Sequence, residues 1–88
     1  MKTVFLLMAQ YDGRAVVPVE DVCRDYFSHL TPDKFIRKAL AGQIDLPLVR
    51  IENSKRAQRG VPLNDLASYL DRQIEEARRD HQQLQEAT

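Results

Sequence analysis

The chain has few of the residues on which most small catalytic or metal sites depend. It contains one cysteine, two histidines and three glycines in 88 residues, and no tryptophan. A single cysteine cannot form a disulfide within the chain, and the histidines stand at no familiar metal-ligand spacing from it. A glycine-rich phosphate loop, a nucleophile elbow and an HExxH motif are all missing. We therefore predict no catalytic residues, metal, cofactor or small-molecule ligand, and expect the protein not to be an enzyme.

Long apolar segments are also missing. The longest, VFLLMA at residues 4–9, is far shorter than the ~20 residues of a membrane-spanning helix. The first residues, MKT, lead into no long hydrophobic core and no cleavage site of the kind that a secretory signal has. The sequence therefore predicts a cytoplasmic protein with no membrane partner.

Neither sign of charge dominates, since 13 lysines and arginines balance 13 acids. The balance conceals a segregation along the chain. Residues 31–60 carry seven Lys and Arg against three acids, a net charge of +4, whereas residues 61–88 carry three against six, a net charge of −3. Because phosphate contacts are local, the basic middle third can bind nucleic acid although the whole chain is neutral. An ordinary solvated charge pattern is the alternative interpretation.

A helix with one basic face is predicted to begin at residue 32. Thr31 can cap it with its hydroxyl, Pro32 suits the first helical position, and Gly42 supplies a left-handed stop. Helical spacing divides the segment into an apolar face and a polar one. The apolar face holds Phe35, Ile36, Ala39 and Leu40, and the other holds Asp33, Lys34, Arg37, Lys38 and Ala41.

A basic hairpin is predicted directly after this helix. Residues 46–51, LPLVRI, indicate a strand, residues 55–60, KRAQRG, a cationic tip in which Gly60 is a turn residue, and residues 61–63 a returning strand. Residues 19–27 indicate an amphipathic helix that a turn at residues 28–30 joins to the basic helix, which makes a helix-turn-helix. A helix-turn-helix followed by a cationic hairpin is the order of parts in a winged helix-turn-helix.

The start of the chain is less clear. Residues 3–11, TVFLLMAQY, fit either a buried strand or a short helix. Good helix formers, Thr3 as a possible cap and Gly13 as a C-terminal glycine favour the helix. Residues 15–17 indicate a short strand, which Pro18 limits to an edge or an end. The segments VPVEDVC at 17–23 and VPLNDLA at 61–67 share a pattern, and each indicates a strand running straight into a helix.

The last segment, residues 64–87, has no Gly or Pro and predicts one long helix, with a Glu75–Arg79 pair adding support. A heptad stripe runs along it, through Ala67, Leu70, Ile74, Ala77, His81 and Leu84. We expect the first half to pack on the domain and the second half to pair with another copy in a homodimer. The candidate dimerisation residues are Leu70, Ile74, Ala77, His81 and Leu84. A solvated or frayed tail is the alternative, because Ala77 and His81 bury little.

The predicted fold class is mainly α with a small β-hairpin: a winged helix-turn-helix plus a long C-terminal helix. Residues 1–72 are expected to form the DNA-binding domain and residues 73–88 a helical extension. The second helix of such a motif enters the major groove, where the planar fork of Arg37 suits O6 and N7 of guanine. The candidate DNA-binding residues are Thr31, Lys34, Arg37, Lys38, Lys55, Arg56 and Arg59, and the alternative is that they merely solvate an exposed face.

The chain also resembles the pyocin activator protein family, the PrtN-type regulators of phage-derived bacteriocin clusters. The resemblance covers residues 3–72 and rests on FLLMAQYDGRAVVPVEDVCRDYF, HLTPDKFIRKALAGQIDLPLVRIENS and RGVPLNDLASYLDR. It implies a small bacterial transcriptional activator, associated with the nucleoid, that binds double-stranded DNA upstream of bacteriocin or prophage-like genes and has RNA polymerase as a further candidate partner. The run from Thr31 to Leu66 is more loosely similar to phage excisionases.

Two other functions stay open from the sequence. An excisionase-like architectural protein would use the same small winged fold to bend DNA during recombination. A protein-interaction adaptor would instead meet an acidic partner with its basic face and bind through its last helix.

Overall fold

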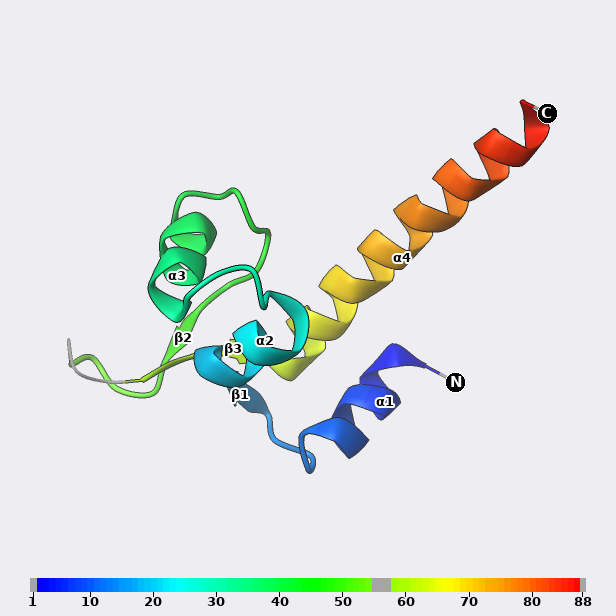
Figure 1. Cartoon of the computed structure of the whole chain (residues 1–88). Helices are drawn as coiled ribbons and strands as arrows, with labels where there is room; N and C mark the ends of the chain where they lie inside the picture. The colour runs from blue at the N-terminus through cyan, green and yellow to red at the C-terminus, as the bar shows by residue number, and fades with distance from the viewer. Residues whose placement is uncertain (1, 55–57, 88) are drawn as a thin grey trace.

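The computed structural model describes residues 2–54 and 58–87. These residues form four helices and three strands, with both ends of the molecule visible in Figure 1. In chain order the elements are α1 (Thr3–Gln10), β1 (Val16–Pro18), α2 (Val19–Tyr26), α3 (Pro32–Leu40), β2 (Val49–Arg50), β3 (Arg59–Pro62) and α4 (Leu63–Glu86). The prediction of a mainly helical chain with a small antiparallel β element is therefore confirmed in outline.

The strands form one antiparallel sheet in the order β1-β3-β2. Strands β2 and β3 make the predicted hairpin, and β1 adds a third strand at the edge, where Pro18 was expected. The predicted strand at 46–51 was too long, because only Val49 and Arg50 pair with β3. Continuing that register would set Pro47 opposite Pro62, and neither proline has an N–H to donate.

Gly60 is not the turn residue that the sequence suggested. It lies in the central strand β3, where it pairs with Pro18 on one side and with Val49 on the other. A Cβ atom at this position would stand 2.9 Å from the carbonyl oxygen of Val17 and would collide with the side chain of Val16. The absence of a side chain is therefore what lets β1 approach β3 closely.

The two VP segments each form a strand that runs directly into a helix, as predicted: β1 into α2 and β3 into α4. Val17 and Val61 face each other across the antiparallel pair. The matching positions that follow are buried in both units, with exposed fractions of at most 5%: Val17 and Val61, Val19 and Leu63, Val22 and Leu66, Cys23 and Ala67. The centre of the core is thus built from two equivalent strand-to-helix junctions.

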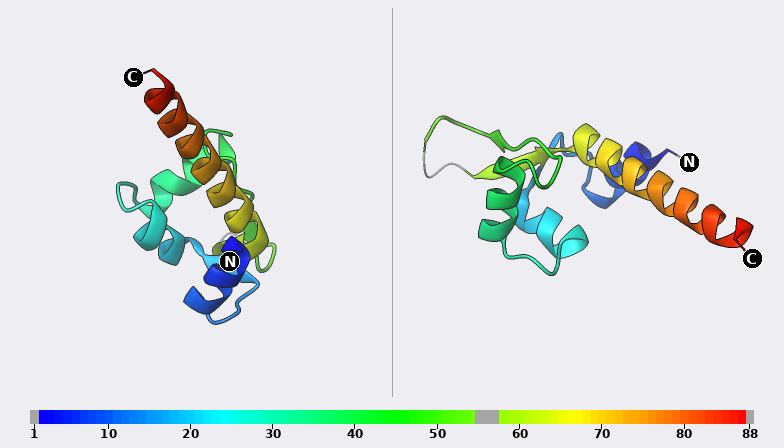
Figure 2. Two further views of the ribbon diagram at one scale, coloured as in Figure 1. Left: turned by 90° about the vertical axis from the view of Figure 1, so that its right-hand side faces the viewer. Right: turned by 90° about the horizontal axis from the view of Figure 1, so that it is seen from above.

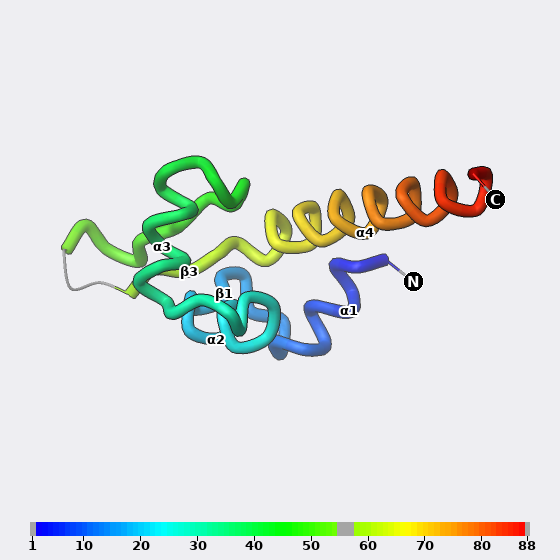
Figure 3. The backbone as a smooth tube through the Cα atoms, turned by 45° about the horizontal axis from the view of Figure 1, so that its top comes forward, coloured from blue at the N-terminus to red at the C-terminus, as the bar shows by residue number. Residues whose placement is uncertain are grey.

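Phe27, at the end of α2, connects the helices. Its ring centroid lies 4.9 Å from that of the fully buried Phe35 on α3 and 5.9 Å from that of Tyr69 on α4. These contacts hold α3 against the body by one face only. In the two views of Figure 2 and the tube of Figure 3, α3 and the β2–β3 hairpin lie at the end of the molecule away from the C-terminus.

The N-terminal segment is a helix, so the choice made from the sequence is confirmed. Thr3 does not cap it, however, because its hydroxyl donates to the carboxylate of Asp71 on α4. The other end of α1 is tied to α2, since the Tyr11 hydroxyl donates to Asp25 at 2.7 Å. Burial and this hydrogen bond raise the pKa of Tyr11, and hydrogen bonds from Arg24 and then Tyr11 lower the pKa of Asp25.

Candidate nucleic-acid interface

Helix α3 begins and ends where its sequence signals predicted. The Thr31 side-chain oxygen accepts the N–H of Lys34 at 3.3 Å, and Pro32 occupies the first turn. At the other end, Gly42 has a φ of 80°, and the N–H of Gln43 donates to the carbonyl of Lys38 at 2.9 Å. Both ends are thereby capped by local hydrogen bonds, which makes this nine-residue helix a rigid support.

The outer face of α3 is basic. Lys34, Arg37 and Lys38 are exposed at helical spacing and together line one open hollow of about 280 Å³. Within the part of the chain that the structure describes, none of the ion pairs involves these cations. Their charges are therefore available to an anionic partner, whereas Phe35 on the opposite face is buried in the core.

Leu40 departs from its predicted place on the apolar face. It is 65% exposed, because the last turn of α3 lies beyond the core and faces the hairpin. There Leu40 and Leu48 share a hollow of about 190 Å³ with Arg50 of β2 and Arg59 of β3. This hollow joins the end of α3 to the base of the β2–β3 hairpin.

The hairpin presents arginines from both strands. Arg59 was predicted at the tip but lies in β3, half-buried, directly opposite the exposed Arg50. The sequence interpretation missed Arg50 as a candidate, because its position beside Arg59 follows only from the register of the strands. The predicted contacts Lys55 and Arg56 lie outside the described residues.

The structure thus gathers the described candidates at one end of the molecule (Figure 2). Three cations extend along α3, and two arginines stand beside its C-terminal end. Thr31 lies at the N-terminus of the same helix, where its side chain acts as the cap. A phosphate backbone and an adjacent groove are the kind of ligand that such a helix and hairpin can contact together.

The candidate dimerisation residues lie on α4, at the other end. Leu70 is half-buried against the core, whereas Ile74 and Leu84 are 41% and 68% exposed, and Ala77 and His81 are exposed as well. The predicted Glu75–Arg79 ion pair is not among those formed by the described residues. The far part of α4 therefore carries apolar and charged side chains with no partner in the body of the molecule.

The remaining searches of the described residues add no other site. No helix among them is long and apolar enough to cross a membrane. Likewise, residues 2–54 and 58–87 contain no cluster of three His, Cys, Asp or Glu side chains that could hold a metal ion. Cys23 is a free, buried thiol, and burial raises its pKa.

Comparison with known proteins gives one match. The sequence model of the family described as "Pyocin activator protein PrtN" matches residues 3–77. No curated protein and no solved structure gives a significant match. The family match covers the sheet, the first three helices and the part of α4 that packs on the body.

Proposed function

The chain belongs to the pyocin activator protein family, and we propose that it is a sequence-specific DNA-binding activator of bacteriocin or prophage-like genes. The family is regulatory and not enzymatic, which agrees with a role in transcription. We assign DNA binding to residues 1–72 and propose that they act as a winged helix-turn-helix. In this arrangement α2 and α3 form the helix-turn-helix, and the β2–β3 hairpin is the wing.

One observation carries this proposal: Lys34, Arg37 and Lys38 share an exposed face of a helix whose other face is anchored in the core. Such a helix can enter a major groove without disturbing the fold. Arg37 is assigned to a guanine edge, since its guanidinium can donate two parallel hydrogen bonds. Lys34 and Lys38 are assigned to flanking phosphates.

The hairpin arginines are assigned to the backbone next to the groove that α3 enters. Arg50 and Arg59 stand side by side on adjacent strands at the C-terminal end of α3. Their position favours contacts to phosphates or to the adjacent minor groove. Lys55 and Arg56 keep the same assignment on sequence grounds alone.

Two copies are proposed to act together through the stripe on α4, with residues 73–88 as the pairing segment. RNA polymerase is the proposed further partner, since an activator must alter the activity of the transcribing enzyme. The cytoplasm and the nucleoid are where such a protein would work.

The test is selection of bound genomic fragments by the purified protein, followed by affinity measurements on the selected duplex. If three cations in each protomer contact phosphates, a dimer makes six contacts, and the logarithm of affinity should fall with the logarithm of salt with a slope of roughly −5. A reporter gene behind the selected site should respond to the protein without an integrase. No dependence on duplex DNA would favour an adaptor, and strong bending with a requirement for integrase would favour an excisionase-like role.

A further inference from the structure

The far part of α4 is a helix without support. Every residue from 71 to 87 is exposed, and the helix extends well past α1 and the core (Figure 1). We call residues 73–86 the distal half of α4. An isolated helix of this length is only marginally stable in water, because too few hydrogen bonds offset the cost of nucleation. A second helix packed against the distal half would supply the missing stabilisation.

The charges of the distal half are arranged for pairing with a copy of themselves. The sequence at 75–79 is Glu-Glu-Ala-Arg-Arg, so the charge pattern inverts about Ala77. In the described residues none of these four charged side chains forms an ion pair within its own copy. Two such helices placed antiparallel about Ala77 set each glutamate at the height of a partner's arginine. A parallel pair would instead set glutamate beside glutamate and arginine beside arginine.

The apolar stripe obeys the same symmetry. An antiparallel pair centred on Ala77 sets Leu70 of one copy at the height of Leu84 of the other. The small side chain of Ala77 then lies on the two-fold axis, where it allows close approach. A two-fold interface requires this reciprocity, since each contact must occur twice.

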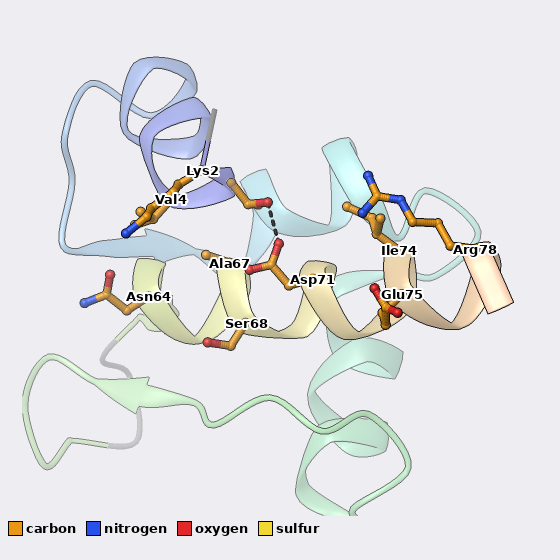
Figure 4. Close-up of a pocket in the computed structure, with 10 residues that line it drawn as sticks. Lys2, Val4, Asn64, Ala67, Ser68, Asp71, Ile74, Glu75 and Arg78 are labelled. Atoms are coloured by element: carbon orange, nitrogen blue, oxygen red, sulfur yellow. Dashed lines mark hydrogen bonds between the residues drawn. The ribbon is translucent and has the colours of Figure 1, made fainter.

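The groove beside α1 extends this surface. Figure 4 shows an open groove of about 740 Å³ between the start of α1 and one side of α4, lined by residues that include Val4, Ala67 and Ile74. Helix α1 also exposes Phe5 and Leu6, each 54%, and Met8, 45%. Because α1 packs on the first half of α4, the partner's distal half would reach it.

We infer that two copies pair through antiparallel α4 helices centred on Ala77, with the distal half of each lying beside α1 of the other. The distal half alone is a strip about 21 Å long and about 10 Å wide, too small for the ~800 Å² per partner of a standard interface. Contact with α1 supplies additional apolar area. The inference rests on the proposed pairing of two copies and is independent of DNA binding.

This arrangement sets the geometry of the DNA-binding ends. Each copy is 54 Å long, and α3 lies at the end away from the C-terminus. Antiparallel pairing through the C-terminal helices therefore places the two α3 helices at opposite ends of the dimer. They would contact half-sites more than one helical turn, about 34–36 Å, apart.

The first experiment measures the mass of the full chain by sedimentation. We expect the wild type to be dimeric and the dissociation constant to rise roughly 10- to 100-fold in E75R/E76R and in R78E/R79E, because each change replaces attraction by repulsion at four contacts. An equimolar mixture of the two variants, and the full inversion E75R/E76R/R78E/R79E, should restore the dimer. All four positions are exposed, so unchanged circular dichroism provides the folding control.

The second experiment determines orientation by disulfide formation between Ile74→Cys and His81→Cys. In the antiparallel pair, positions 74 and 81 of different copies lie at nearly the same height. Two copies of position 74 would be about 9 Å apart along the helix, beyond the ~7 Å that a disulfide spans. We expect a mixed disulfide when the variants are combined and little from either alone. The buried Cys23 gives little background.

Three outcomes would overturn the inference: a wild type that stays monomeric, charge variants that dimerise like the wild type, or disulfides between identical positions in place of the mixed one. A monomer that still binds its selected duplex would leave the proposed function standing. A dimer with the predicted disulfide that ignores DNA would do the reverse.

Discussion

Replacement of Arg37 by alanine should reduce sequence discrimination and leave the fold intact. Its side chain is exposed and joins no ion pair among the described residues, so the free energy of unfolding should change by no more than about 0.5 kcal/mol. Loss of a bidentate guanine contact costs about 1–3 kcal/mol, which corresponds to roughly 5- to 150-fold weaker binding of the selected site. Binding to random duplex should fall much less.

The measurement is fluorescence anisotropy with the selected duplex and a scrambled one, at two or more salt concentrations. Arg50→Ala should weaken both duplexes alike and make the salt slope shallower by about 1 per lost phosphate contact. Arg14→Ala is the matched control, because this exposed arginine pairs with Asp21 at 3.7 Å, away from α3. Equal losses on both duplexes for Arg37→Ala would refute its assignment to a base edge.

Three further predictions concern the fold. Phe35→Ala should lower the free energy of unfolding in urea by about 3–5 kcal/mol, since the ring is fully buried, and an undiminished value would contradict its role as the anchor of α3. Gly60→Ala should cost about 1–3 kcal/mol, because the new Cβ forces β1 away from β3, whereas Gly13→Ala would relieve no such contact and serves as a comparison for strain from positive φ alone. The lowered pKa of Asp25 means that its stabilising contribution is complete above the unfolded value of about 3.9 and is lost as the pH falls through the lower folded value; urea titrations of wild type and Asp25→Asn should therefore differ at pH 6 and converge at low pH, and a constant difference would contradict this.

The parts of the molecule that follow from the sequence are those set by local signals. Thr31, Pro32 and Gly42 determine where α3 begins and ends through hydrogen bonds within a few residues of each other, so the helix could be predicted from composition and spacing. The same holds for the two strand-to-helix junctions, each of which contains a proline at a fixed place. The basic face of α3 could be predicted for the same reason.

The parts that could not be predicted depend on contacts between distant segments. The pairing of β1 with β3, and with it the reason for Gly60, requires knowing which strands are neighbours. Arg50 became a candidate only when the register placed it opposite Arg59. Leu40 fits the apolar pattern of its helix but extends past the edge of a small core, which no helical period records.

The account combines two surfaces at opposite ends of one elongated molecule. The basic end is anchored to the core through Phe35, so that binding there can leave the core undisturbed. The distal half of α4 joins two copies and separates their basic ends. Bacteriocin or prophage-like genes would then be controlled from two half-sites held by one dimer.

The most direct test of the central claim is DNA cleavage by an iron chelate tethered to Lys38→Cys on α3 or to Arg59→Cys on β3. If the helix face and the hairpin contact the same duplex, both positions should cleave the selected site within one helical turn, about 10 base pairs, of each other. Cleavage from only one position, or from sites further apart than that, would contradict a single interface made by both elements.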